Sequence, residues 1–99
     1  MNLKEKAKEI RSLVADLHKQ DKNWKWKVKK MSQHSVTLYW EYLEYMGAQS
    51  DAFTIDYDVE LEFFVVYDEK GEFIDWDLED VDSIEGTIKS VFYYARSRY

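Results

Sequence analysis

Residues 53–67 read FTIDYDVELEFFVVY, and this stretch carries the strongest secondary-structure signal of the chain. Its odd-numbered positions are apolar or aromatic, and its even-numbered positions are polar up to residue 62. Alternation with a period of two is typical of a strand that buries one of its faces. We therefore predict one strand over residues 53–67, with a bulge or bend because such a length is unusual.

Three further strands follow from the same alternation. The first covers residues 24–29, where tryptophan and valine alternate with lysine, and the second covers residues 35–46. The fourth comes after segment 68–71, whose Asp-Glu-Lys-Gly sequence is typical of a hairpin loop. Its inward-facing side chains are Ile74, Trp76 and Leu78.

Amphipathic helices are predicted at both ends of the chain. The first covers residues 3–19 with Asn2 as its N-cap, and the last begins at Asp82, whose spacing to Glu85 is that of a capping box. Each helix carries one apolar stripe at helical spacing. The stripes consist of Leu3, Ala7, Ile10, Val14 and Leu17, and of Ile84, Ile88, Val91, Phe92 and Ala95.

The order of these elements predicts a single α+β domain over residues 1–99, with the layout α-β-β-β-β-α. A four-stranded antiparallel meander with both helices on one face is the economical architecture, and it leaves the opposite face in solvent. Hairpin loops at 47–52 and 68–71 would set the register of the strands. The resulting cross-strand pairs are Trp40 with Val59, Tyr42 with Tyr57, Val65 with Ile74, Phe63 with Trp76, and Tyr67 with Glu72.

Composition restricts the class of protein. Of the 99 residues, 45% are hydrophobic and 17% are aromatic, which is typical of a packed domain and not of a disordered chain. Without cysteine, neither a disulfide framework nor a thiolate metal site can form, and a cytoplasmic location is the expectation. We expect no secretory signal and no membrane span, because no apolar run is long enough for either.

The net charge of −6 is distributed unevenly along the chain. Residues 1–30 carry ten Lys or Arg and four acids, whereas residues 31–88 carry sixteen acids and a single lysine. Residues 89–99 add three basic side chains and no acid. Such asymmetry predicts a strong field over part of the surface.

The predicted register gathers carboxylates on the outer face of the sheet. Asp56, Asp58, Glu60 and Glu62 would follow the third strand at intervals of about 6.6–6.8 Å. Like charges would then lie directly across two strand pairs, with Glu41 opposite Asp58 and Glu62 opposite Asp77. Such pairs destabilise a sheet, and folding does not require them. The predicted partner-binding residues are Asp56, Asp58, Glu60, Glu62, Asp75, Asp77, Glu41 and Tyr39.

This array predicts a non-catalytic binding protein, an inhibitor that presents an acidic, nucleic-acid-like face to a basic nucleic-acid-handling protein. The carboxylate spacing roughly matches the charge spacing along one nucleic-acid strand. In size, charge and simplicity of fold the chain resembles phage-encoded inhibitors of bacterial defence, including anti-CRISPR proteins that imitate DNA. The resemblance implies no particular residue. An ordinary solvated face on an acidic protein is the competing interpretation.

Other functions are also compatible with the sequence. Outer-face aromatics are compatible with a structural homodimer, and the charge is equally compatible with an immunity or antitoxin-type protein. A nucleic-acid binder through residues 24–30 is less favoured, because alternation separates the tryptophans from the lysines. No nucleophile elbow, phosphate loop or His-rich metal motif is present in the sequence, so we expect no enzyme, no metal and no cofactor.

The acidic face depends on the order of the strands. In a simple meander the lysines of residues 25–29 lie on the far side of the second strand, away from Asp56 and its neighbours. If the first strand paired with the third instead, those lysines would neutralise the carboxylates.

Overall fold

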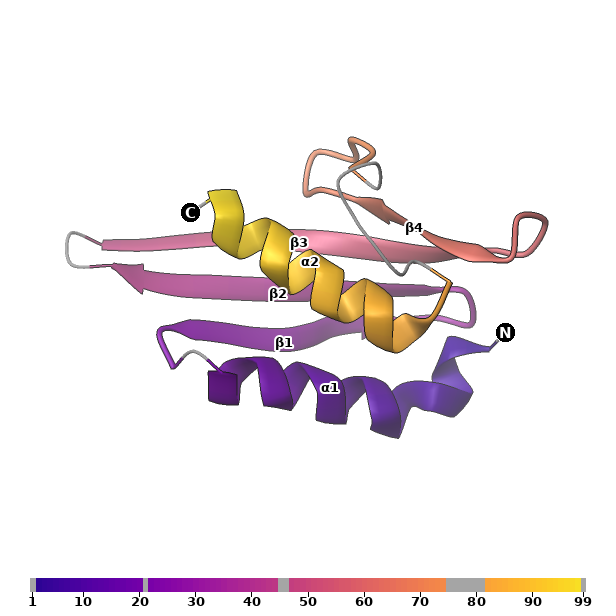
Figure 1. The fold of residues 1–99 in the computed structure, drawn as a ribbon, viewed down its shortest axis with the longest axis horizontal. Helices are drawn as coiled ribbons and strands as arrows, with labels where there is room; N and C mark the ends of the chain where they lie inside the picture. The colour runs from indigo at the N-terminus through magenta and orange to yellow at the C-terminus, as the bar shows by residue number, and fades with distance from the viewer. Residues whose placement is uncertain (1, 21, 45–46, 75–81, 99) are drawn as a thin grey trace.

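The computed structural model describes residues 2–20, 22–44, 47–74 and 82–98 of the chain. Its elements follow the predicted α+β order of helix, four antiparallel strands and helix (Figure 1). They are a 3-10 turn Leu3–Lys6, α1 Ala7–Gln20, β1 Trp24–Met31, β2 Ser35–Glu44, β3 Gly47–Asp58, β4 Phe63–Tyr67 and α2 Ile84–Arg98.

The four strands form one antiparallel sheet in the order β1-β2-β3-β4, which confirms the predicted meander. Helix α2 crosses one face of the sheet, and α1 runs along β1 (Figure 1). Aromatic rings fill the space between α2 and the sheet. The Trp26 and Phe92 ring centroids lie 5.9 Å apart, as do those of Phe53 and Tyr94.

The predicted helix boundaries are close to the observed ones, and one cap differs. Asn2 accepts the amide N–H of Lys4 through its side chain at 3.0 Å, as expected for the first N-cap. At the start of α2 the cap is Ser83, one residue after the predicted Asp82. Its hydroxyl accepts the Gly86 amide N–H at 3.0 Å. No helix among the described residues is long and apolar enough to span a membrane.

The prediction of one strand over residues 53–67 is wrong, because a tight turn divides it. Strand β3 ends at Asp58, residues 59–62 turn, and β4 returns beside β3 with Asp58 opposite Phe63. The Asp58 carboxylate accepts the amide N–H groups of Glu60 and Leu61 at 2.9 and 3.0 Å. Its carbonyl accepts the Glu62 amide N–H at 2.8 Å. The side chain thus supplies the hydrogen bonds that a turn without glycine or proline needs.

The turn reverses which residues of β4 face the core. In the β3–β4 register each odd-numbered residue pairs with an even-numbered one, for example Ile55 with Val66. Phe64 and Val66, which an unbroken strand would turn outward, are therefore fully buried. Phe63 and Val65, which were predicted to face inward, point to the opposite face of the sheet, where Phe63 is half-buried and Val65 is buried.

The predicted register between the second and third strands is also wrong. Only two residues of the chain separate the end of β2 from the start of β3, and Glu44 lies opposite Gly47. Trp40 consequently lies opposite Asp51, not Val59, and Tyr42 lies opposite Gln49, not Tyr57. Segment 47–52 is strand because pairing it satisfies backbone groups that a loop would leave to water.

The predicted fourth strand is reduced, within the described residues, to one bridge between Tyr67 and Phe73. Tyr67 therefore does not pair with Glu72. The neighbouring Ile74 is buried and donates its amide N–H to the carbonyl of Val66 at 3.0 Å, so it does not pair with Val65. Trp76 and Leu78 lie outside the described residues.

Replacing Phe64 tests the reversed orientation of β4. We expect Phe64→Ala to lower the free energy of unfolding by about 3–5 kcal/mol, because it leaves a cavity in the core. The matched variant Phe63→Ala removes the same group from the partly exposed neighbour and should cost about 1 kcal/mol or less. Urea denaturation of both variants measures the difference. A larger loss for Phe63→Ala would contradict the observed register.

Candidate functional site

Four of the predicted binding residues lie together in what we call the acidic hairpin, residues 56–62. Asp56 is on β3 between Ser35 of β2 and Val65 of β4, and Asp58 ends the strand. Glu60 and Glu62 are exposed in the turn. The chain therefore concentrates four carboxylates within seven residues at one end of the sheet.

The other predicted residues do not extend this group. Glu41 lies on β2 opposite Lys25 and Ser50, so its predicted pairing with Asp58 is wrong. Tyr39 lies opposite Lys27, whose ammonium is 5.1 Å from the centre of the Tyr39 ring.

The remaining two predicted residues, Asp75 and Asp77, lie outside the described residues. The predicted pairing of Glu62 with Asp77 required Glu62 to be in a strand, and it is in a turn instead.

The outer face of the sheet is mixed in character, not uniformly acidic. Exposed lysines of β1 lie along one side of it. At its centre the hydroxyls of Thr37 and Thr54, which face each other across β2 and β3, are 3.3 Å apart. On the other side β4 contributes Phe63, Val65 and Tyr67. The regular carboxylate ladder predicted along this face therefore ends at Asp58.

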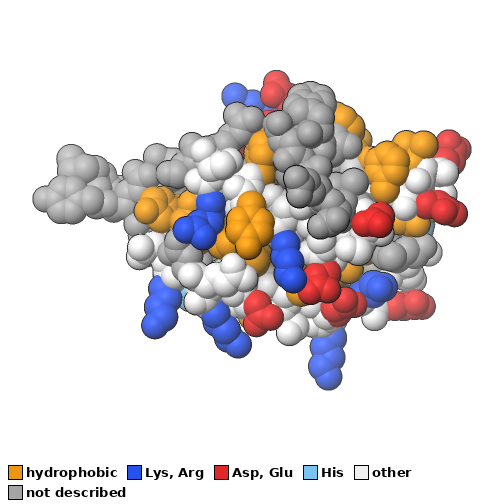
Figure 2. Space-filling model, in the orientation of Figure 1, with side chains coloured by type: hydrophobic (Ala, Val, Ile, Leu, Met, Phe, Trp, Pro, Cys, Tyr) orange, Lys and Arg blue, Asp and Glu red, His pale blue; other side chains and the backbone are white. Residues whose placement is uncertain are grey.

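The carboxylates of the acidic hairpin have no cationic neighbours at ion-pair distance among the described residues. The ion pairs that the described residues do form lie within helical segments. They join Lys6 with Glu9, Lys19 with Asp16, and Lys89 with Glu85. Acidic and hydrophobic side chains occur together at the right-hand end of Figure 2, where Figure 1 places the β3–β4 turn.

Two aliphatic side chains project from the same turn. Val59 and Leu61 are each 59% exposed, although folding favours the burial of such groups. They alternate with Glu60 and Glu62, so the tip presents both apolar and negatively charged surface. Exposed apolar groups rimmed by charge are typical of protein–protein contacts.

Glu62 adopts a left-handed backbone conformation, with φ of 58°. This conformation costs a residue with a Cβ roughly 1 kcal/mol or more, and glycine avoids the cost. The chain nevertheless has a glutamate there. Backbone strain retained at an exposed acidic position suggests that the side chain has a role apart from folding.

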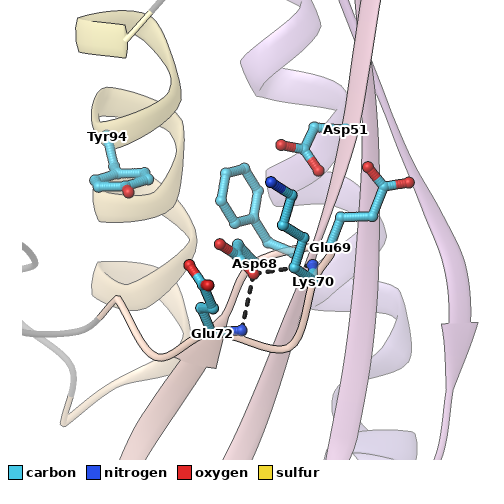
Figure 3. Close-up of a pocket in the computed structure, with 7 residues that line it drawn as sticks. Asp51, Asp68, Glu69, Lys70, Glu72 and Tyr94 are labelled. Carbon is cyan, nitrogen blue, oxygen red and sulfur yellow. Dashed lines mark hydrogen bonds between the residues drawn. The ribbon is translucent and has the colours of Figure 1, made fainter.

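A second acidic group, which the sequence interpretation missed, surrounds a pocket of about 200 Å³ (Figure 3). It lies between β3, the turn after β4 and helix α2. Its lining residues are Asp51, Phe53, Asp68, Glu69, Lys70, Glu72 and Tyr94. Segment 68–71 was recognised only as a turn, and the wrong register placed Asp51 in a loop.

The carboxylates around this pocket have different surroundings. Asp68 accepts the amide N–H groups of Lys70 and Glu72 at 2.9 and 2.8 Å, so its role is to hold the turn. Glu69 shares a hydrogen bond with Asp51, and this contact, with the repulsion between the two groups, raises the pKa of Glu69. A hydrogen bond from Glu69 to Asp51 is possible only when Glu69 carries its proton, so this contact favours the protonated form of Glu69.

Neither acidic group is assembled as a metal centre. Within the described ranges, no three His, Asp or Glu side chains are placed to hold one ion together. One oxygen each of Asp58 and Asp68 already accepts amide N–H groups of its turn. The geometry of both groups suits the attraction of a cationic surface or side chain.

Comparison with protein-family models, with curated proteins and with solved structures gives no match to this chain.

Glycine at position 62 tests the strain in the acidic hairpin. We expect Glu62→Gly to raise the free energy of unfolding by about 0.5 kcal/mol, because relief of the left-handed conformation exceeds the entropy cost of glycine. Glu60→Gly is the control, since it removes the same charge from a residue without positive φ, and it should lower stability. Thermal or urea unfolding reports both values. Stabilisation by Glu60→Gly would show that charge repulsion, not backbone strain, is being relieved.

Removing the Asp51 charge tests the carboxyl pair. Because the pKa of Glu69 is raised, the folded state retains this proton more readily than the unfolded state, and the associated stability is lost as pH rises through the folded pKa. Asp51→Asn should lower the Glu69 pKa toward its usual range, as measured by NMR titration of the Glu69 carboxyl. Glu72→Gln, in the same turn, should leave it unchanged. An equal shift in both variants would mean that general field effects dominate.

Proposed function

We propose that this chain is a non-catalytic binding protein that uses its acidic hairpin to inhibit a basic, nucleic-acid-handling protein. The single observation that carries the proposal is the set of four carboxylates at residues 56–62, which have no ion-pair partner among the described residues. Fields of this kind accelerate encounter with a positively charged partner and make binding sensitive to salt.

The projecting turn supports a protein as the partner. Val59 and Leu61 would enter an apolar depression, while the carboxylates around them meet basic groups at its rim. Burying two aliphatic side chains supplies affinity that charge alone does not, since exposed ion pairs contribute little. If the acidic hairpin were only a solvated surface, its charges would be accounted for. Its two exposed aliphatic side chains would not be.

Imitation of nucleic acid remains the more specific form of the proposal. Asp56 and Asp58 lie on one face of β3, at the spacing of about 6.6–6.8 Å that alternate strand residues have. The imitation would involve a short segment, because the carboxylates continue around a turn and not along a flat strand. Inhibitors of bacterial defence encoded by phages are the class that this resembles in size and charge.

Reversing charge in the acidic hairpin tests the proposal. The triple variant Asp56→Lys, Glu60→Lys and Glu62→Lys leaves Asp58 in place, because its carboxylate holds the turn. We expect binding to weaken at least tenfold, measured by affinity capture from host lysate followed by titration with the purified partner.

The control variant reverses three exposed acids of the N-terminal helical segment, namely Glu5, Glu9 and Asp16, and so has the same net charge. It should bind as the wild type does. The captured protein should itself bind nucleic acid, and DNA or RNA should compete with this chain for it. Equal binding by both variants, or no competition by nucleic acid, would contradict the proposal.

A further inference from the structure

Strand β3 extends well beyond its neighbour β4. It pairs with β2 over residues 47–56 but with β4 only over residues 54–58 (Figure 1). Residues 47–53 therefore have a paired strand on one side only, within the part of the chain that the structure describes. The turn 68–70 lies beside Asp51 and Phe53, with which it lines a pocket, so the edge is open to a further strand at residues 47–50.

Two hydrogen bonds show which backbone groups point to the open edge. The Tyr57 amide N–H donates to the carbonyl of His34, on the β2 side, and the Asp58 carbonyl accepts from Glu62, on the β4 side. Because successive residues of a strand point to opposite sides, Ser50 and Ala52 present their N–H and C=O groups to the open edge. The ladder with β2 does not use these groups.

The side chain of Asp51 occupies part of this edge. It accepts the amide N–H of Ala52 at 2.7 Å, which satisfies one edge donor in place of a neighbouring strand. A charged side chain at an open edge also disfavours pairing with an unrelated or identical strand. The edge is thus protected against indiscriminate pairing, while the Ser50 backbone groups remain available.

The acidic pocket adjoins the same segment. Asp51 and Phe53 follow the open residues 47–50 on β3 and line the pocket, and Tyr94 of α2 lies opposite them (Figure 3). A residue across from position 49 on an added strand would point its side chain to the same face as Asp51, because alternate residues of a strand share a face. That face is the one on which the pocket lies.

We propose that the open edge of β3 binds an extended peptide segment by strand addition, with one lysine or arginine of the segment in the acidic pocket. This site is separate from the acidic hairpin and does not depend on the function proposed for it. The backbone of Ser50 would supply hydrogen bonds, and the pocket would select the side chain.

Charge identifies the occupant as a cationic segment and not a second copy of this chain. The pocket lining contains four carboxylates and one lysine. Antiparallel pairing of two copies along this edge would bring Asp51 and Glu69 of each close to the same groups of the other. A cationic side chain would instead separate the two carboxyls, and Phe53 and Tyr94 would contact its aliphatic stem.

Binding of a defined peptide tests this inference. The probe is a seven-residue peptide of alternating threonine and valine with a central arginine. The control peptide is identical except that glutamine replaces the arginine. The NMR spectrum of the full chain should show shifts and slower hydrogen exchange at the Ser50 amide with the arginine peptide. Binding should also lower the Glu69 pKa, because the cation stabilises its ionised form.

Variants of the chain separate this site from the acidic hairpin. Asp51→Asn with Glu69→Gln should weaken binding of the arginine peptide about tenfold or more, while Glu60→Gln with Glu62→Gln, which removes the same charge, should leave it unchanged. Ser50→Pro removes an N–H that faces the open edge and that the sheet does not use. In this variant the arginine peptide should no longer slow hydrogen exchange at the remaining amides of residues 47–53. Equal binding of both peptides, equal loss in both double variants, or shifts confined to other strands would overturn the inference.

Discussion

The turn at residues 59–62 is the constraint on which the remaining architecture depends. It forms because the carboxylate and carbonyl of Asp58 accept three successive backbone N–H groups, from Glu60, Leu61 and Glu62. Without it, residues 53–67 would continue as one strand. With it, β4 folds back on β3, and its even-numbered residues enter the core.

Two consequences for the surface follow from this turn. Carboxylates that would have been distributed along a strand are brought together at one end of the sheet, beside exposed aliphatic groups. Because β4 is short, it pairs only with the last part of β3, and among the described residues it leaves 47–50 as an open edge. The acidic hairpin and the open edge are therefore products of the same chain reversal.

The two acidic regions differ in construction. In the acidic hairpin the charges lie on a projecting turn, where solvent screens them and where they act on an approaching surface as a group. In the pocket, Asp51 lies close enough to Glu69 to raise the pKa of the Glu69 carboxyl through hydrogen bonding and charge repulsion. The first arrangement suits a broad basic surface, and the second suits a single cationic side chain.

The amino-acid sequence alone determined the α+β class, the order of its elements, both helices and the inward faces of β1 and β2. These features depend on local periodicity, on capping side chains and on the alternation of tryptophan with lysine. The sequence also identified Asp56, Asp58, Glu60 and Glu62 as a concentrated charge.

Only the tertiary structure decided the division of residues 53–67, the strand register and hence the neighbours of each carboxylate. The alternating pattern continues through Val59 and Leu61 without glycine or proline, so the pattern does not mark the turn, and only its excessive length was a warning. Register is set by pairing between distant segments. A change of one residue in that pairing reverses every side chain, which local periodicity cannot detect.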